Sequence, residues 1–378
     1  MNKSNLKAIK EQVNSVHMLP VPMEVTEVYS HSAPPDLPKE QIIDAKKNIA
    51  RAEKSIRQTI KRDVCLICKR SVSSFCSSHS IPRFVLENIA DQGYVSALEQ
   101  ANSLEPNKNT GVGSAGVFAN ICRECDNTEF QSYEEESAFS FQPTDEMLAK
   151  IATKNNLKWI HKSLVDAEGE KLFTSKIAIP QIIKRGDMTT YEHDLREFQH
   201  ELEYALKTAS YHLYYYKKLD YVIPFAAQYT IAMLEDLSGN LINDIYNPSK
   251  EYRLEYLHVA IFPLSDSSVI LLFTKEGETR HRRFFRQLRK LDEMDQLSTI
   301  NYLTFSGTDN VFINPTVYAK LIQNPDFLAV CRMTYSIQSN IPRPQSLKIA
   351  MQAHSFDNRK AFPNLLSPEY ALKTISKA

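Results

Sequence analysis

Glycine is scarce in this chain, with only 9 Gly among 378 residues. Loops that cradle phosphates need glycine for their tight turns and for close approach of the backbone to the ligand. The sequence has neither a P-loop motif nor a dinucleotide-binding fingerprint, so a Gly-rich nucleotide loop is not expected. The same scarcity favours helices over a fold rich in hairpin turns.

An excess of either charge is also missing, because 45 Lys and Arg residues balance 45 Asp and Glu residues. Proteins that merely coat nucleic acid are usually basic overall, so we expect any phosphate contact to come from a local patch. No apolar run reaches the roughly 18 residues of a candidate membrane helix, and no signal-peptide pattern opens the chain. We therefore expect a soluble, cytoplasmic protein with no membrane partner.

The length allows two or three domains, and the residue pattern changes along the chain. Residues 1–39 contain five prolines and predict an extended arm. Residues 40–62 predict an amphipathic helix with a basic face. Residues 63–136 hold a cysteine-rich module, and residues 137–378 predict a larger helical domain with a β-hairpin at about 257–274. The predicted fold class is α+β and mainly helical.

Within these regions the local patterns predict individual elements. We expect a flexible or hairpin insertion at 91–118, where polar residues and glycines gather. Apolar spacing predicts helices at 82–89, 157–164, 194–218, 224–237 and 280–297. The helix at 194–218 would end in the aromatic run Tyr211-His-Leu-Tyr-Tyr-Tyr216.

Two basic clusters have both a structural and a functional interpretation. One includes Lys54, Arg57 and Lys61 on the first predicted helix, and the other includes Arg282, Arg283 and Arg286. Each cluster is either a solvated helix face or a surface that binds the nucleic-acid backbone. The tyrosines at 211–216 likewise either pack in the core or stack on bases. The sequence leaves these alternatives open.

The organising motif is a pair of Cys-x2-Cys knuckles, Cys65/Cys68 and Cys122/Cys125. Four thiolates complete a tetrahedral zinc site with no open position, which makes the ion structural. Six cysteines, four of them in such pairs, fit reduced metal ligands better than disulfides. In a rival arrangement, Cys76 and His79 join the first knuckle in a Cys3His finger, which would leave the second knuckle without partners.

The order of parts resembles the HNH (ββα-metal, His-Me finger) endonucleases, in particular their zinc-stapled branch. The resemblance rests on the first knuckle, on Ser77-Ser-His79-Ser-Ile-Pro82 and on Asn120-Ile-Cys122-Arg-Glu-Cys125-Asp126. It covers about residues 63–135. It implies a small ββα-metal module that hydrolyses phosphodiester bonds of nucleic acid, with DNA favoured over RNA, in a bacterial restriction, mobile-element or anti-phage setting.

The resemblance also implies a role for individual residues. His79, at the end of the first strand, is the general base that takes a proton from water, and Asn120 braces the loop and orients it. Asp126 holds a catalytic Mg2+ or Mn2+, with Asn127 as the alternative and Glu134 as a second candidate carboxylate. Arg83 joins the residues expected to contact nucleic acid.

Two features depart from the family pattern. Many members have Asp or Glu before the histidine as a second metal ligand, whereas this chain has Ser78. The stretch from His79 to Cys122 is also longer than is typical, which the insertion at 91–118 explains.

The Ser78 departure supports an alternative function, a non-catalytic zinc module that binds nucleic acid or protein. A toxin-like RNase is a third option. We expect the C-terminal region to bind a protein partner, to mediate self-association or to select the substrate.

Overall fold

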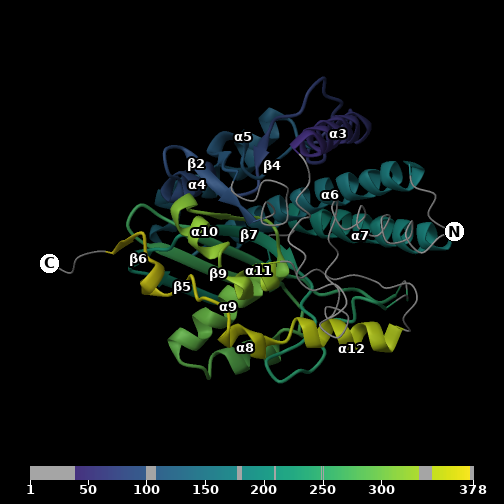
Figure 1. The fold of residues 1–378 in the computed structure, drawn as a ribbon. Coiled ribbons are helices and arrows are strands. Elements are labelled where there is room, and N and C mark those ends of the chain that lie inside the picture. Colours follow the sequence, from purple (N-terminus) through teal and green to yellow (C-terminus); the bar gives the residue numbers. More distant parts are fainter. Residues whose placement is uncertain are drawn as a thin grey trace.

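The computed structural model describes residues 39–98, 108–176, 181–207, 210–247, 249, 251–331 and 343–374. The predicted N-terminal arm lies outside the described residues except for its last residue. The described chain is α+β, with more residues in helices than in strands, which confirms the predicted fold class. Its elements stack as layers around one central sheet (Figure 1).

Seven antiparallel strands form the central sheet in the order β3-β2-β10-β7-β8-β9-β5. In this order their bounds are Thr110–Gly111, Tyr94–Ala97, Val311–Ile313, Phe225–Ile231, Leu257–Pro263, Ser268–Lys275 and Tyr211–Leu219. Two small sheets accompany it: β1 (Ser78–His79) pairs with β4 (Val117–Phe118), and β6 (Tyr221–Val222) pairs with β11 (Lys373–Thr374).

The central strands are buried on both faces. Ala260 and Leu271 belong to one hydrophobic cluster, whereas their sequence neighbours Val259 and Leu272 belong to a second cluster. This alternation follows from the two-residue period of a strand. A strand covered on both sides needs apolar residues at every position, which is why β7, β8 and β9 read as continuous apolar runs.

Helices cover the two faces of the sheet (Figure 1). The cysteine module and the paired helices α6 (Asp145–Lys176) and α7 (Gln181–Lys207) contribute to the first hydrophobic cluster. The module carries α4 (Arg83–Ile89) and α5 (Arg123–Phe130), and α3 (Lys39–Thr59) packs on α6. The other face is covered by α8 (Arg282–Leu288), α9 (Glu293–Gly307), α10 (Pro315–Leu321) and α11 (Pro325–Cys331). Helix α12 spans Arg343–Ala353.

Several predicted elements are confirmed and others are corrected. The helices expected at 40–62, 82–89 and 157–164 and the hairpin near 257–274 are present as α3, α4, part of α6 and β8–β9. The helix predicted at 194–218 ends at Lys207, and its aromatic run lies in strand β5. The helix predicted at 224–237 is strand β7, because a short apolar run buried on both sides lacks the period that separates strand from helix.

The insertion predicted at 91–118 contains structure where it is described. It holds β2, β3 and β4, and β2 pairs with β10. The module therefore contributes strands to the sheet of the C-terminal region. The single helix predicted at 280–297 is divided into α8 and α9, because Asp292 caps the second helix by accepting a hydrogen bond from Asp295 N. None of the described helices is long and apolar enough to cross a membrane.

Gly116 joins the module to the sheet and tolerates no side chain. Its φ is +66°, and a Cβ atom there would lie 2.5 Å from Ser80 Oγ and 3.0 Å from the Phe312 ring. We predict that Gly116→Ala lowers the free energy of unfolding by about 2 kcal/mol, the cost of a strained left-handed residue. Urea unfolding of the zinc-loaded protein measures this loss.

Gly113→Ala is the matched control, because nothing lies within 4 Å of a Cβ atom at Gly113. We expect its unfolding free energy to stay within about 0.5 kcal/mol of the wild type. Equal losses in the two variants would contradict this account of Gly116.

Candidate functional site

The two cysteine knuckles come together in the folded chain. The Sγ atoms of Cys65, Cys68, Cys122 and Cys125 all lie within 4.8 Å of one another. The first knuckle turns through Lys69, whose φ is +58° and whose amide donates to the Cys65 carbonyl. The second knuckle begins α5, where the amide of Cys122 donates to Cys65 Sγ at 3.3 Å.

The geometry of this tetracysteine cluster fits a zinc ion. Four ligands at about 2.3 Å in a tetrahedron lie about 3.8 Å apart, and Cys68 Sγ is 3.9 Å from Cys122 Sγ. Arg70 donates to Cys68 Sγ at 3.4 Å, and this bond lowers the pKa of Cys68 to about 6, which favours the thiolate that binds metals. The cluster could therefore hold a structural zinc.

The rival Cys3His arrangement is not formed. Cys76 donates its thiol to the Ile121 carbonyl, and burial raises the pKa of Cys76 to about 12. His79 Nε2 instead faces the Val112 carbonyl. Neither side chain joins the tetracysteine cluster, which uses both knuckles.

A strand–strand–helix unit follows the first knuckle, in the order that the resemblance implies. Ser78 and His79 form β1, which pairs with β4 in an antiparallel register that sets His79 opposite Val117. Helix α5 follows β4 and carries Asp126. His79 therefore lies at the end of the first strand, as expected from the sequence. The second strand and then the helix of the second knuckle follow it along the chain.

The hydrogen bond of His79 determines which ring nitrogen is free. Nε2 lies 3.0 Å from the Val112 carbonyl oxygen. A carbonyl only accepts, so Nε2 carries the proton of the neutral ring and Nδ1 keeps its lone pair. The ring is half-buried. An imidazole held by this hydrogen bond with Nδ1 free can act as a base.

Ser78 and Asp126 meet directly. Ser78 Oγ donates to Asp126 Oδ1 at 2.5 Å, and the Ser78 side chain is buried. The residue before the histidine and the residue after the second knuckle are therefore adjacent in space. These are the two positions at which the resemblance implies ligands of a catalytic ion. Here the pair provides one carboxylate and one hydroxyl.

The other predicted site residues have different surroundings. Asn120 is buried and donates its amide to the Leu157 carbonyl of α6 at 2.8 Å, so it joins the module to α6. Asn127 is exposed. Glu134 pairs with Lys154, which is fully buried. Among the described residues, the clusters of three or more His, Cys, Asp or Glu side chains include neither Asp126 nor Glu134.

The two predicted basic clusters lie far apart. Lys54, Arg57 and Lys61 are exposed on α3 or just after it, on the side of the sheet that carries the module (Figure 1). Arg282, Arg283 and Arg286 are exposed on α8, on the opposite side. Arg83 pairs with Glu87 at 2.9 Å, and Arg283 pairs with Asp236 at 2.9 Å.

The aromatic residues near these clusters pack inside the protein. Phe284 and Phe285 are buried, as the structural interpretation of the second cluster expects. Tyr211 is buried, and Tyr214 stacks on Phe285 with ring centroids 4.3 Å apart. These rings are thus engaged in packing.

Zinc content tests the tetracysteine cluster. We predict one zinc ion per purified chain, and we predict that Cys122→Ser loses this ion and melts at a lower temperature, because metal-binding energy is also folding energy. Elemental analysis and thermal unfolding measure the two effects.

Cys76→Ser provides the matched control, because its thiol lies outside the cluster. We expect this variant to retain its full zinc content. Loss of zinc in Cys76→Ser, with retention in Cys122→Ser, would instead establish the Cys3His arrangement.

Comparison with known proteins adds no relative from which a function can be transferred. No family model, no curated protein and no solved structure matches this chain. A functional assignment therefore depends on the geometry of the site.

Proposed function

We propose that this chain is a metal-dependent, HNH-type endonuclease that hydrolyses phosphodiester bonds, with DNA favoured over RNA. The observation that supports this most is the position of His79. It ends β1 with Nδ1 free, and its neighbour Ser78 contacts Asp126 on α5. The tetracysteine cluster lies at the N-terminal end of α5, because this helix begins at the second knuckle.

In this mechanism His79 Nδ1 accepts a proton from a water molecule as the water attacks the phosphorus atom. The Val112 carbonyl holds the Nε2 proton and stabilises the imidazolium that forms. Asp126 would hold the catalytic ion through its carboxylate. A bound Mg2+ or Mn2+ supplies Lewis-acid stabilisation of the leaving 3′ oxygen.

The basic surface of α3 is the proposed contact for the nucleic-acid backbone. Helix α3 leads into the first knuckle and exposes Lys54 and Arg57 on the module's side of the sheet. The α8 cluster is too distant to share the same duplex contact with the module. The C-terminal region would select substrate or bind a partner, and the reduced thiols of the cluster fit a cytoplasmic location.

A non-catalytic zinc module is the second candidate, and one observation favours it. Ser78 replaces an acidic ligand, and the Glu134 carboxylate is paired with buried Lys154. Asp126 is therefore the single carboxylate offered by the predicted catalytic residues. Such a protein would hold zinc and bind nucleic acid or protein without cleaving a phosphodiester bond.

Cleavage by zinc-matched variants tests the nuclease proposal. We predict that the wild type cleaves plasmid DNA with Mg2+ or Mn2+, and that His79→Ala lowers the rate about 100- to 10,000-fold, the usual contribution of a general base. Asp126→Asn should also lose activity. Total RNA, assayed in parallel, determines the substrate class.

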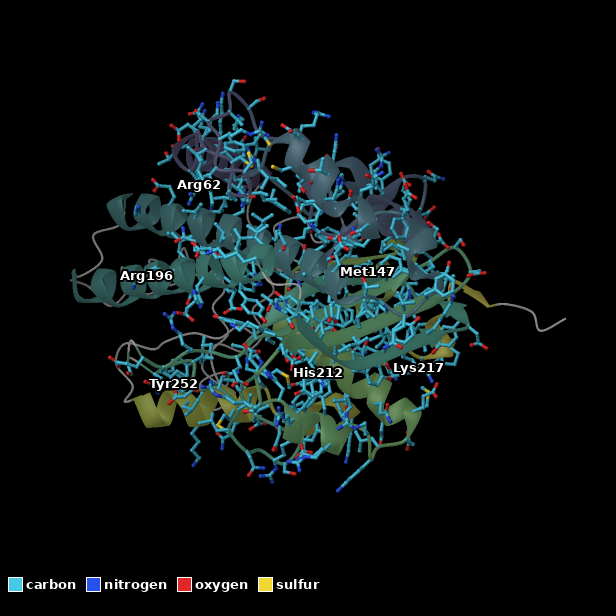
Figure 2. All side chains as sticks on the ribbon, turned by 180° about the vertical axis from the view of Figure 1, so that it is seen from behind. Arg62, Met147, Arg196, His212, Lys217 and Tyr252 are labelled. Atoms are coloured by element: carbon cyan, nitrogen blue, oxygen red, sulfur yellow. The ribbon has the colours of Figure 1, made fainter. Side chains whose placement is uncertain are left out.

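His212→Ala is the control for removal of a histidine. His212 is exposed on β5, far from Arg62 and the module (Figure 2). It should cleave at the wild-type rate. If His79→Ala retains zinc and full activity, His79 is not the base; if no protein cleaves DNA or RNA, the non-catalytic module is the better description.

The salt dependence of binding tests the α3 surface. Replacing Lys54, Arg57 and Lys61 by Ala together should weaken DNA binding and reduce the slope of log K against log salt by up to about 2.7, because each lost phosphate contact removes about 0.9. Arg282→Ala with Arg286→Ala should leave the slope unchanged. The reverse result would move the DNA contact to α8.

A further inference from the structure

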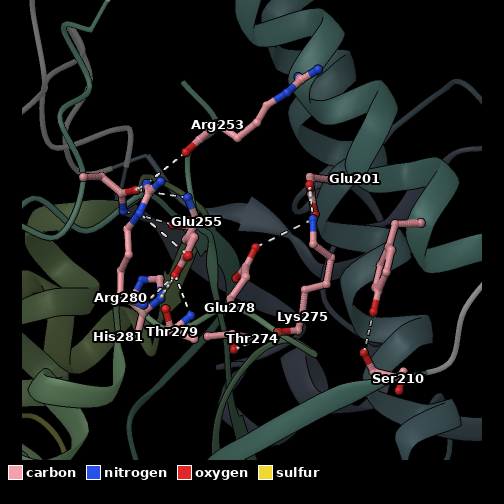
Figure 3. A network of polar contacts seen from close by, with 12 residues as sticks. Glu201, Ser210, Arg253, Glu255, Thr274, Lys275, Glu278, Thr279, Arg280 and His281 are labelled. Atoms are coloured by element: carbon pink, nitrogen blue, oxygen red, sulfur yellow. Dashed lines mark hydrogen bonds and ion pairs between the residues drawn. The ribbon is translucent and has the colours of Figure 1, made fainter. Parts of the chain in front are cut away.

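A second cluster of metal-ligating side chains lies outside the proposed nuclease site. Glu255 precedes β8, Glu278 lies in the turn after β9, and His281 is the N-cap of α8. One ligand atom from each lies within 4.8 Å of the other two. Figure 3 shows the three side chains converging, with Lys275 and Arg280 beside them. No sequence motif joins these three residues, which come from separate segments of the chain.

Two members of this cluster are buried and have polar atoms without hydrogen-bond partners. The side chain of His281 is 1% exposed, and neither ring nitrogen forms a hydrogen bond. The side chain of Glu278 is 8% exposed, and its Oε2 has no hydrogen-bond partner. Buried polar atoms are nearly always paired in folded proteins, so these unpaired atoms require a ligand or an equivalent partner.

The distances fit shared coordination better than hydrogen bonding. His281 Nδ1 lies 3.9 Å from Glu255 Oε2, which is too far for a hydrogen bond. Two ligands at about 2.1 Å from one tetrahedral ion lie about 3.4 Å apart.

Glu255 is already fixed in place. Its Oε2 accepts hydrogen bonds from the amides of Thr279 and Arg280, at 3.0 and 2.7 Å. These amides belong to the turn that carries Glu278 and His281, so Glu255 is held against the other two ligands. Such second contacts orient a carboxylate before a metal binds.

The charged side chains around the cluster do not exclude a bound cation. Lys275 lies 2.6 Å from Glu201 and 3.7 Å from Glu278, and Arg280 lies 3.7 Å from Glu255. Burial raises the pKa of Glu278 to about 8, so a cation that binds at pH 7 would displace a proton from this carboxyl. With all of these groups ionised, three carboxylates face two basic side chains and leave a net charge of −1. A bound divalent ion would change this net charge from −1 to +1.

We propose that Glu255, Glu278 and His281 bind a first-row divalent cation. Two carboxylate oxygens and one imidazole nitrogen form a donor set that suits Mn2+, Fe2+ or Zn2+. The ion would tie the turn after β9 to the segment before β8, and its three protein ligands would leave a coordination position for water or another ligand. The proposal does not depend on nuclease activity.

Manganese binding to the zinc-loaded full chain tests this site, because Mn2+ prefers oxygen and nitrogen ligands to the thiolates of the tetracysteine cluster. Electron paramagnetic resonance measures free Mn2+ in a titration. We expect the wild type to bind Mn2+, and we expect Glu278→Gln and His281→Gln to weaken this binding at least tenfold. Echo modulation from a directly bound nitrogen should be present in the wild type and absent in His281→Gln.

Two control variants separate this site from the others. Glu197→Gln removes a buried carboxylate paired with Arg253, outside the three ligands, and Asp126→Asn removes the proposed nuclease ligand. Both should retain the nitrogen-coupled Mn2+ site. Wild-type protein that shows no nitrogen-coupled Mn2+, or nitrogen-coupled binding that is unchanged in Glu278→Gln, would overturn the proposal. Binding lost only in Asp126→Asn would also overturn it and would assign the ion to the nuclease site, so the two proposals fail independently.

Discussion

Burial on both faces of strands β7, β8 and β9 determines how the rest of the molecule is arranged. Neither face can meet water, so one face requires the module with α6 and α7, and the other requires α8 to α11. The module is attached by hydrogen bonds as well as by apolar packing. Ser80 donates to Asn310, which itself donates to the Gln228 carbonyl of β7, and Asn88 donates to the Pro263 carbonyl of β8. The position of His79 is thus set by the sheet, through residues far away in sequence.

The features that the sequence predicted correctly have local causes. The knuckle spacing places the four cysteines in one cluster, and the apolar period of residues 40–62 forms α3. The β8–β9 hairpin follows from two apolar runs and a polar turn. The two errors have different causes. At 224–237, burial on two sides removed the alternation that marks a strand, and the aromatic run at 211–216 was assigned to the preceding helix.

The candidate sites were predictable only in part. The residue types around His79 were visible as a motif, but its free nitrogen depends on the carbonyl of Val112, 33 residues away. The ion pair between Glu134 and Lys154 depends on the packing of α6 against α5. Glu255, Glu278 and His281 come from three segments with no characteristic spacing, so their cluster requires the tertiary fold.

The pairing of β2 with β10 has a consequence for how such a protein can evolve. A catalytic unit that folds alone can be exchanged between proteins as a cassette. This unit instead lends a strand to its neighbour, and its removal would leave an open sheet edge, which invites association with other chains. Recombination that replaced the module would have to replace the matching edge as well. The two parts therefore form one folding unit, although only one of them carries the cysteine motif.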